Sequence, residues 1–329
     1  MYFSKYMNEW LYGEEGYYKT FKAIGKIGDF YTAVSTSRFF GASIANYFYQ
    51  LLKDDKANKD GWLIEIGAHQ GYLLCDMIQW LYTCDPQLVK TLKFGIVERQ
   101  NEVRKAQLAY IHERFGDDIE ITHFNDISDV KVNYAFVVAN EIFDAFPCEL
   151  LRNGKVALVI DDKIVWEDAT EKMLSWAKKH HLKQGEVAQG YEKFANEMAT
   201  GIKKCDFVTF DYGEKYVRND FSIRVYRSHE TFPLFDDDLV LCESFKKDDI
   251  TYDVNFGHVS EAFEAENFTE VLYETQARAL IRFGLIDILE QFSKHATQEQ
   301  YAREADRIKT LISPTMMGDR FKMIHLKKV

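Results

Sequence analysis

The sequence predicts an α/β fold built on a mostly parallel sheet, and three segments carry this prediction. Each is a short apolar run that ends in glycine or polar residues, which is typical of parallel strands buried on both faces. The three segments are Trp62 to Gly71 (WLIEIGAHQG), Leu92 to Glu98 (LKFGIVE) and Tyr134 to Asp144 (YAFVVANEIFD). Because helical periodicity lies between them, the chain alternates strand and helix. We therefore expect one continuous α/β domain with helical and hairpin insertions.

The first segment predicts a strand, a tight glycine loop and a helix. Gly67 and Gly71 bound the loop, and a helical stripe begins at Tyr72. Such a loop places main-chain N–H groups at a helix N-terminus, where open α/β sheets bind nucleotide-like ligands. Its spacing is G-x-x-x-G, with Glu65 two residues ahead, rather than the dinucleotide pattern G-x-G-x-x-G. This pattern is typical of S-adenosylmethionine (SAM) methyltransferases, and a plain strand-to-helix turn is the alternative. The candidate cofactor-binding residues here are Glu65, Gly67, Ala68, His69 and Gly71.

Composition excludes several classes of function. The 329 residues are 47% hydrophobic, which is ample for a large core, and the net charge of −11 without a basic block disfavours a nucleic-acid partner. The five cysteines form no C-x-x-C pair and the histidines form no ligand-spaced set, so we expect no metal. The N-terminus does not resemble a signal peptide, and no apolar run approaches the ~20 residues of a membrane span. These features fit a reducing cytoplasm.

Residues 1–60 precede the first sheet strand and are predicted to form a helical extension. Helical spacing covers residues 1–11 and 37–52, and a glycine-rich loop lies between them. Gly28, Asp29 and Thr32 in that loop could form a lid over a polar ligand, or the loop could be a plain connector. Residues 61–329 then form the predicted catalytic domain, with insertions at 149–204 and 228–316.

Polar residues follow the predicted strands at the edge where a ligand would lie. Glu98 at the end of the second strand could accept both ribose hydroxyls, or could be a surface residue starting the next helix. Asp126 and Ile127 would hold an adenine ring by its amino group and by stacking, with a solvated turn as the alternative. Asn140, Glu141 and Asp144 follow the central strand, and Asn140 is a further candidate cofactor-binding residue.

The remainder of the chain predicts further hairpins, strands and helices. Asn153-Gly154 lies inside a predicted meander at 149–166, because Asn-Gly between apolar runs is a strong hairpin signal. We expect helices at 171–180, 186–204, 253–266, 275–289 and 301–312, strands at 206–213, 222–227 and 321–326, and an irregular acidic loop at 232–249.

Together these segments resemble the MidA-like family of SAM-dependent methyltransferases, which includes the mitochondrial complex I assembly-factor methyltransferase. The matching motifs span nearly the whole chain: GYY at 16–18, GDFYTA at 28–33, SRFFG at 37–41, EIGAHQG at 65–71, VERQ at 97–100, VVANEIFDAFP at 137–147, FDYG at 210–213, RVYRSHE at 224–230, DITYDVNF at 249–256, TQARALIRFGL at 275–285 and MGDRFKMIHL at 317–326. The resemblance implies a class I methyltransferase Rossmann-like sheet with an antiparallel last strand. It also implies SAM at the glycine loop with Glu98 on its ribose, and a protein arginine as acceptor, with a respiratory-complex subunit as one candidate partner.

An arginine acceptor agrees with the residues themselves. A guanidinium is planar and always charged, and carboxylates bind it best in a bidentate manner. Glu141 and Asp144 could form such a clamp, with Glu141 taking the proton and Asp144 orienting the acceptor. Alternatively, one of these two carboxylates caps the following helix, with Asp144 the better candidate than Glu141.

His69 departs from the family loop E-x-G-P-G-R-G, where the middle position is glycine. A side chain there could be tolerated or could weaken SAM binding, so two functions stay open. One is an active SAM-dependent protein arginine methyltransferase. The other is a catalytically silent MidA-like binding or assembly factor. A nicotinamide-dependent oxidoreductase is disfavoured by the loop spacing. The meander at 149–166 could form a homodimer surface.

Overall fold

The structure is a computed structural model that describes residues 1–19, 32–227 and 230–329. The chain forms two compact units, each assembled from three separate segments. Unit 1 comprises Met1–Tyr31, Phe143–Lys193 and Tyr212–Ala262, and unit 2 comprises Thr32–Ile142, Phe194–Asp211 and Phe263–Val329. The division of the chain at residue 60 stays a prediction, as do the insertion boundaries. Gly28 and Asp29 lie outside the described residues.

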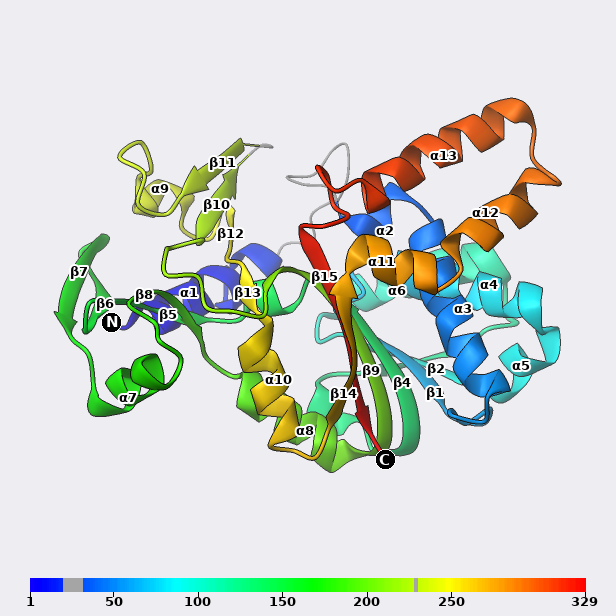
Figure 1. The fold of residues 1–329 in the computed structure, drawn as a ribbon, viewed down its shortest axis with the longest axis horizontal. Helices are drawn as coiled ribbons and strands as arrows, with labels where there is room; N and C mark the ends of the chain where they lie inside the picture. The colour runs from blue at the N-terminus through cyan, green and yellow to red at the C-terminus, as the bar shows by residue number, and fades with distance from the viewer. Residues whose placement is uncertain (20–31, 228–229) are drawn as a thin grey trace. The chain divides into compact units, whose positions relative to one another are not determined.

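Unit 2 contains the predicted mostly parallel sheet (Figure 1). The strand order is β14-β15-β9-β4-β1-β2-β3, with bounds Thr269–Thr275 (β14), Phe321–Lys328 (β15), Ile202–Glu214 (β9), Val132–Asn140 (β4), Trp62–Ile66 (β1), Lys93–Val97 (β2) and Ile121–Phe124 (β3). β1, β2, β3, β4 and β9 pair in parallel, whereas β14 and β15 are antiparallel. The α/β prediction, including an antiparallel end to the sheet, is confirmed.

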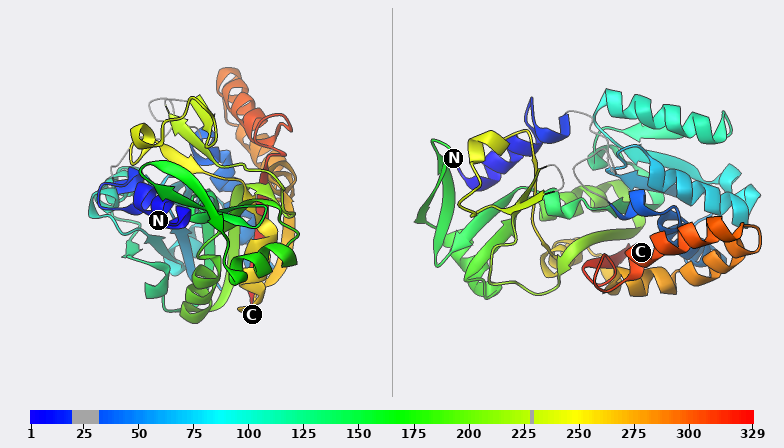
Figure 2. Two further views of the ribbon diagram at one scale, coloured as in Figure 1. Left: turned by 90° about the vertical axis from the view of Figure 1, so that its left-hand side faces the viewer. Right: turned by 90° about the horizontal axis from the view of Figure 1, so that it is seen from above.

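Helices cover this sheet. They are α2 (Ala33–Thr36), α3 (Phe39–Lys53), α4 (Tyr72–Cys84), α5 (Pro86–Thr91), α6 (Asn101–Phe115), α11 (Gln276–Arg282), α12 (Leu285–Ser293) and α13 (Gln298–Ile312), with the short η2 at Ile127–Asp129. The predicted single helix at 275–289 is interrupted, because Gly284 adopts φ +89° and caps the start of α12. α12 and α13 lie side by side (Figures 1 and 2).

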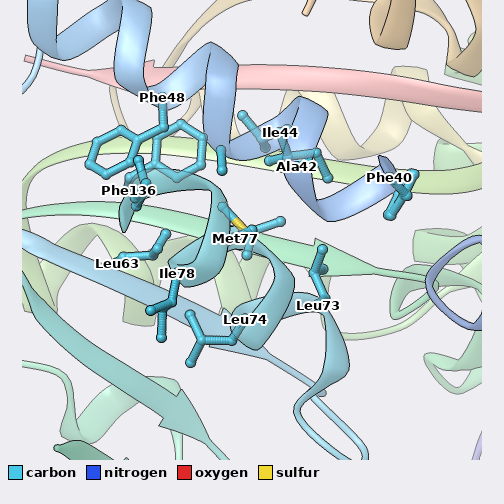
Figure 3. Close-up of a cluster of buried hydrophobic side chains, with 14 of the residues drawn as sticks. Phe40, Ala42, Ile44, Phe48, Leu63, Leu73, Leu74, Met77, Ile78 and Phe136 are labelled. Carbon is cyan, nitrogen blue, oxygen red and sulfur yellow. The ribbon is translucent and has the colours of Figure 1, made fainter. Parts of the chain in front are cut away.

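The core of unit 2 forms where α3 and α4 pack over the sheet (Figure 3). Phe48 of α3 stacks on Phe136 of β4, with ring centroids 4.5 Å apart. The labelled side chains of α4 in Figure 3, together with Leu63 of β1, complete this cluster and are almost fully buried. Each such side chain contributes about 1.5–3 kcal/mol by leaving water. This packing fixes the strand β1 from which the glycine loop begins.

Unit 1 contains two small antiparallel sheets. One has the order β7-β6-β5-β8, with bounds Lys163–Asp168, Lys155–Ile160, Cys148–Arg152 and Gln184–Ala188. The other has the order β11-β10-β12, with bounds Glu230–Pro233, Arg224–Arg227 and Asp249–Thr251. Its remaining elements are α1 (Phe3–Tyr12), η1 (Tyr17–Lys19), η3 (Phe143–Ala145), α7 (Glu171–Lys179), α9 (Leu241–Ser244) and β13 (Val254–Asn255). α8 (Tyr191–Gly201), α10 (Phe256–Glu264) and β9 contribute residues to both units.

The meander prediction is confirmed, and Asn153 and Gly154 form its first turn with φ values of +51° and +78°. The helix predicted at 186–204 is wrong at both ends. Residues 184–188 form β8, which pairs with β5 and so satisfies that strand's second edge. Residues 202–204 begin β9. The acidic stretch at 232–249 was predicted to be irregular. It contains the end of β11, the short helix α9 and the first residue of β12.

None of the described helices is long and apolar enough to cross a membrane.

Candidate active site

The predicted ligand edge of the sheet is assembled within unit 2. Ile66, the last residue of β1, lies opposite Val97 of β2 and Ala139 of β4, and Val97 lies opposite Phe124 of β3. The residues that follow these strands therefore emerge at one edge. They are the glycine loop at 67–71, Glu98, Asp126 with Ile127, and Asn140 with Glu141.

The glycine loop adopts the conformation that its sequence predicts. Gly67 and Gly71 have φ values of +72° and +80°, which side chains other than glycine rarely adopt. A Cβ on Gly67 would lie 3.1 Å from Ile142 Cγ2, so the position is also sterically tight. Gly71 is the N-cap of α4, and Ala68 is buried. The main-chain amides of this loop therefore precede a helix N-terminus, the position that suits a nucleotide-like ligand.

His69 is accommodated in the loop by a left-handed backbone with φ +45°. Its carbonyl accepts a hydrogen bond of 2.8 Å from Gln107 Nε2, and Gln107 Oε1 lies 2.8 Å from His123 Nε2. Gln107 is fully buried, so this pair fixes the loop from the side of α6. Neither Gln107 nor His123 is among the residues that the sequence predicts for the site. The available signal was Gln107's spacing of four residues from Val103 and from Ile111, which places it on the buried face of α6.

Glu65 joins strand β1 to helix α4. It is 3% exposed, and its Oε2 accepts a hydrogen bond of 3.0 Å from the Leu74 amide. Burial raises the pKa of Glu65 to about 8, although the Leu74 hydrogen bond opposes the rise. The side chain is therefore largely protonated at neutral pH, and its assignment to cofactor binding stays a prediction.

Glu98 lies directly after β2, and its contact with a ribose stays a prediction. One carboxylate oxygen, Oε1, accepts from the Gln100 amide at 2.8 Å, which orients the side chain directly after β2. Arg104 donates through Nε to the Glu98 carbonyl at 2.7 Å and through Nη2 to Asn125 Oδ1 at 2.7 Å. The main chain at Glu98 is thus held by Arg104 of α6.

Asp126 and Ile127 form the start of η2. Asp126 accepts from the Ser128 amide at 3.1 Å and from Arg99 Nη2 at 2.8 Å, so it acts as a helix cap and an ion-pair partner. Ile127 is 4% exposed. Their contact with an adenine ring stays a prediction. Thr32, predicted to lie in a lid, is the N-cap of α2, and its Oγ1 accepts from the Ser35 amide at 3.2 Å.

Asn140 and Glu141 form a polar pair at the end of β4. Asn140 Nδ2 donates to Glu141 Oε1 at 2.7 Å, and the Glu141 amide donates to the Phe210 carbonyl at 2.8 Å. Glu141 has φ +53°, a strained conformation for a residue with a side chain. Asn140 Oδ1 is buried, and no described residue donates to it. A buried acceptor without a donor is rare in native proteins, and here it suits a ligand N–H.

Asp144 belongs to unit 1, where it lies in η3. The Tyr212 hydroxyl donates to Asp144 Oδ2 at 2.5 Å and also lies 2.6 Å from Thr251 Oγ1. Burial raises the pKa of Asp144 to about 6, although the Tyr212 hydrogen bond and the Arg224 charge oppose the rise. Since Asp144 and Glu141 fall in different units, the predicted clamp between them stays a prediction.

Within the described residues, no group of three or more His, Cys, Asp or Glu side chains could hold a metal ion.

Comparison with known proteins agrees with this geometry. Residues 43–274, more than half of the chain, match a family described as "Putative S-adenosyl-L-methionine-dependent methyltransferase". The Drosophila melanogaster protein arginine methyltransferase NDUFAF7 homolog, mitochondrial, is 24% identical over 98% of this chain and 80% of its own length. The Rattus norvegicus protein arginine methyltransferase NDUFAF7 is 23% identical over the same shares.

A solved structure shows the same fold. A COG1565 superfamily member from Burkholderia thailandensis, crystallised with S-adenosyl-homocysteine, superimposes with a TM-score of 0.83 at 22% identity. The superposition covers 99% of this chain and 87% of that one. The predictions of a MidA-like methyltransferase fold and of SAM as cofactor are thereby confirmed, and the chain belongs to the family of S-adenosyl-L-methionine-dependent methyltransferases.

Proposed function

We propose that this protein transfers a methyl group from SAM to an arginine side chain of a protein partner. One observation carries the proposal: at the end of β4, Asn140 Oδ1 is buried, has no donor among the described residues and lies beside the Glu141 carboxylate. N–H donors satisfy such a pair, and a guanidinium offers them in a planar, charged array. The names of the relatives, protein arginine methyltransferases, support the same acceptor.

Residues of unit 2 would hold SAM. The amides of residues 67–71 would hold its amino-acid end, and the Glu98 carboxylate would hold its ribose. When bound, SAM supplies an electrophilic methyl group on a positively charged sulfur.

The chain's own residues then have to align the acceptor and remove a proton. Asn140 Oδ1 would accept an N–H of the guanidinium and so fix the plane of the acceptor. The nitrogen that gains the methyl group would give up one proton. Glu141 would take this proton, during or after the transfer.

That the acceptor is a protein is part of the proposal. A respiratory-complex subunit as acceptor, a homodimer through the 149–166 meander and a cytoplasmic location remain predictions.

Two measurements on the purified protein test the function. The first is thermal unfolding with S-adenosylhomocysteine, where ligand at 100 times Kd should add about 2.7 kcal/mol to the free energy of unfolding. Glu98→Ala should remove this shift, whereas Glu102→Ala, an exposed neighbour on α6, should leave it intact. The second is transfer of radiolabelled methyl from SAM to co-purifying protein, followed by hydrolysis and detection of methylarginine.

The outcomes separate the two functions that the sequence left open. Methylarginine in the hydrolysate supports the proposal. Label on another residue type keeps a methyltransferase but refutes arginine as acceptor. Partner binding that survives Glu141→Ala, with no incorporated label, favours a catalytically silent assembly factor.

A further inference from the structure

We propose that Trp166, Phe221 and Phe235 form a docking surface for an arginine-containing segment of a partner polypeptide. All three residues belong to unit 1, and we call them the aromatic surface. The inference goes beyond the proposed function, because it concerns where a partner is held and not which of its residues is methylated.

The three rings contact one another although they come from distant parts of the chain. The ring centroids of Phe221 and Phe235 are 4.7 Å apart, and that of Trp166 lies 5.9 Å from Phe221 and 6.1 Å from Phe235. Phe235 is 39% exposed, and the other two residues are half-buried. Large aromatic side chains usually bury most of their surface, and an exposed cluster with a polar border is typical of an interaction site.

Hydrogen bonds of the main chain hold the segments that carry these rings. Trp166 lies in β7, which pairs with β6. The amides of Ser222 and Ile223 donate to Glu186 Oε1 at 2.7 and 2.8 Å, and the Leu234 amide donates to the Ile223 carbonyl at 3.0 Å. These residues adjoin the two phenylalanines in the sequence. Because the surface is already ordered, a partner that binds it loses little affinity to the ordering of this chain.

Carboxylates border the aromatic surface. Each aromatic residue has an exposed carboxylate next to it in the sequence, namely Glu167, Asp220 and Asp236, and exposed Asp237 and Asp238 extend the series. Within the part of the chain that the structure describes, none of these carboxylates forms an ion pair. A cationic partner is therefore attracted to this border, whereas a second copy of the surface would bring like charges together.

The aromatic surface already holds one guanidinium. The guanidinium carbon of Arg152 lies 4.2 Å from the centroid of the Trp166 ring. A guanidinium is planar and stacks on aromatic faces, whereas the ammonium of lysine is compact and strongly hydrated. The exposed ring of Phe235 offers a place for a second guanidinium, supplied by the partner, whose charge Asp236 would balance. The occupant is therefore a segment that contains arginine.

The test uses the full-length protein labelled with fluorotryptophan and short peptides with a central leucine. The leucine is flanked on both sides by arginine, by lysine or by glutamate. Fluorine NMR should show that the arginine peptide shifts the Trp166 resonance, which Trp166→Phe identifies. The lysine peptide should bind about threefold more weakly, and the glutamate peptide should leave the resonance unchanged.

Two variants test the contacts that the surface would make. Phe235→Ala removes the exposed ring, and Asp236→Asn combined with Asp237→Asn removes two of the bordering charges. Each variant should weaken binding of the arginine peptide about fivefold. All three positions are exposed, so both variants should fold like the natural protein.

Each variant has a matched control in unit 1. Tyr216→Ala removes an aromatic ring that is 65% exposed and lies outside the aromatic surface. Asp161→Asn combined with Asp162→Asn removes two exposed charges from the turn between β6 and β7. Neither control should change the affinity for the arginine peptide more than about twofold.

Several results would overturn the proposal. They are an unchanged affinity in Phe235→Ala, an equal loss in Tyr216→Ala, equal binding of the arginine and lysine peptides, and no shift of the Trp166 resonance with the arginine peptide. A Trp166 resonance that moves with protein concentration in the absence of peptide would assign the surface to a second copy of the chain, and this too overturns the proposal.

These outcomes are distinguishable from failure of the proposed function. Peptide binding that depends on Phe235, without any methyl transfer, leaves the docking surface and removes the reaction. Methyl transfer to a partner protein with an unchanged KM in Phe235→Ala removes the docking surface and leaves the reaction.

Discussion

Strands β4 and β9 lie side by side in unit 2 and carry two buried polar clusters that differ in one respect. At Asp206, every strong partner is present: His325 Nε2 lies 2.9 Å from Oδ1, Lys327 Nζ donates at 3.0 Å and the Tyr134 hydroxyl donates to Oδ2 at 3.0 Å. Four residues further along the same strands, Asn140 Oδ1 has no described donor and Glu141 is strained.

The paired cluster at Asp206 stabilises the folded protein, whereas the arrangement at Asn140 and Glu141 does not. A buried carboxylate that is fully paired contributes to the folded state as long as all its partners remain. A buried acceptor that lacks a donor weakens the folded state, and so does a left-handed glutamate. The second arrangement lies at the edge where the strands meet the glycine loop, which agrees with the proposed role in ligand binding.

Removal of the Asp206 carboxylate should have the largest effect on stability. Asp206→Ala leaves His325 and Lys327 without their anion, and we expect a loss of about 3–5 kcal/mol in the free energy of unfolding. Urea unfolding measures it. Asp54→Ala, which breaks the exposed pair of Asp54 with Lys56, should cost less than about 1 kcal/mol. If the two variants unfold alike, the Asp206 cluster is not structural.

Substitution of Glu141 should act on turnover and not on folding. Glu141→Gln keeps the shape but cannot take a proton, so methyl transfer should slow by about 10²-fold or more with unchanged urea unfolding. Glu120→Gln, an exposed site, is the control. Glu141→Gly sharpens the contrast, because it should relieve the positive φ and raise stability while abolishing activity. Full activity in Glu141→Gln would exclude the proton-accepting role.

Glu65 lies between these two cases, because its buried carboxyl accepts one hydrogen bond, from the Leu74 amide. Its shifted pKa predicts that the stability of the protein depends on pH. Its folded pKa of about 8 exceeds its ordinary value of 4.5 because of burial. The folded protein therefore binds a proton that the unfolded chain releases, so stability should fall as pH rises from 4.5 through 8. Glu65→Gln stays neutral, and its stability relative to the natural protein should increase over this range. Denaturant unfolding at several pH values checks this, with exposed Glu113→Gln as control. Parallel pH curves for Glu65→Gln and the natural protein would contradict the shift.

Substitution of His69 is expected to change the free energy of unfolding least among these variants. His69→Gly removes a side chain from a left-handed position while keeping the carbonyl that Gln107 holds, and we expect stabilisation by about 1 kcal/mol. S-adenosylhomocysteine should bind at least as tightly. The control is His123→Gln, which keeps a polar partner near Gln107. A loss of cofactor binding in His69→Gly would show that the imidazole contacts the ligand.

The sequence predicted the parallel sheet well because its strands are continuous apolar runs that end in polar residues. The same pattern located Glu98, Asn140 and Glu141 at one edge. It could not predict β8, since Gln184 to Ala188 becomes a strand only by pairing with β5, a contact between distant segments. Gln107 was missed for a related reason. Its role depends on contacts with His69 and His123, which are distant along the chain, and periodicity does not indicate such contacts.

Strand β15 follows every other strand along the chain and yet lies inside the sheet, between β14 and β9. During synthesis, β9 therefore leaves the ribosome before β15 exists. More than a hundred further residues are made before β15 can pair with it. An uncovered edge of this kind is a site for aggregation. We expect nascent chains that stall before residue 321 to require chaperone protection, and substitutions of the catalytic residues should not change this requirement.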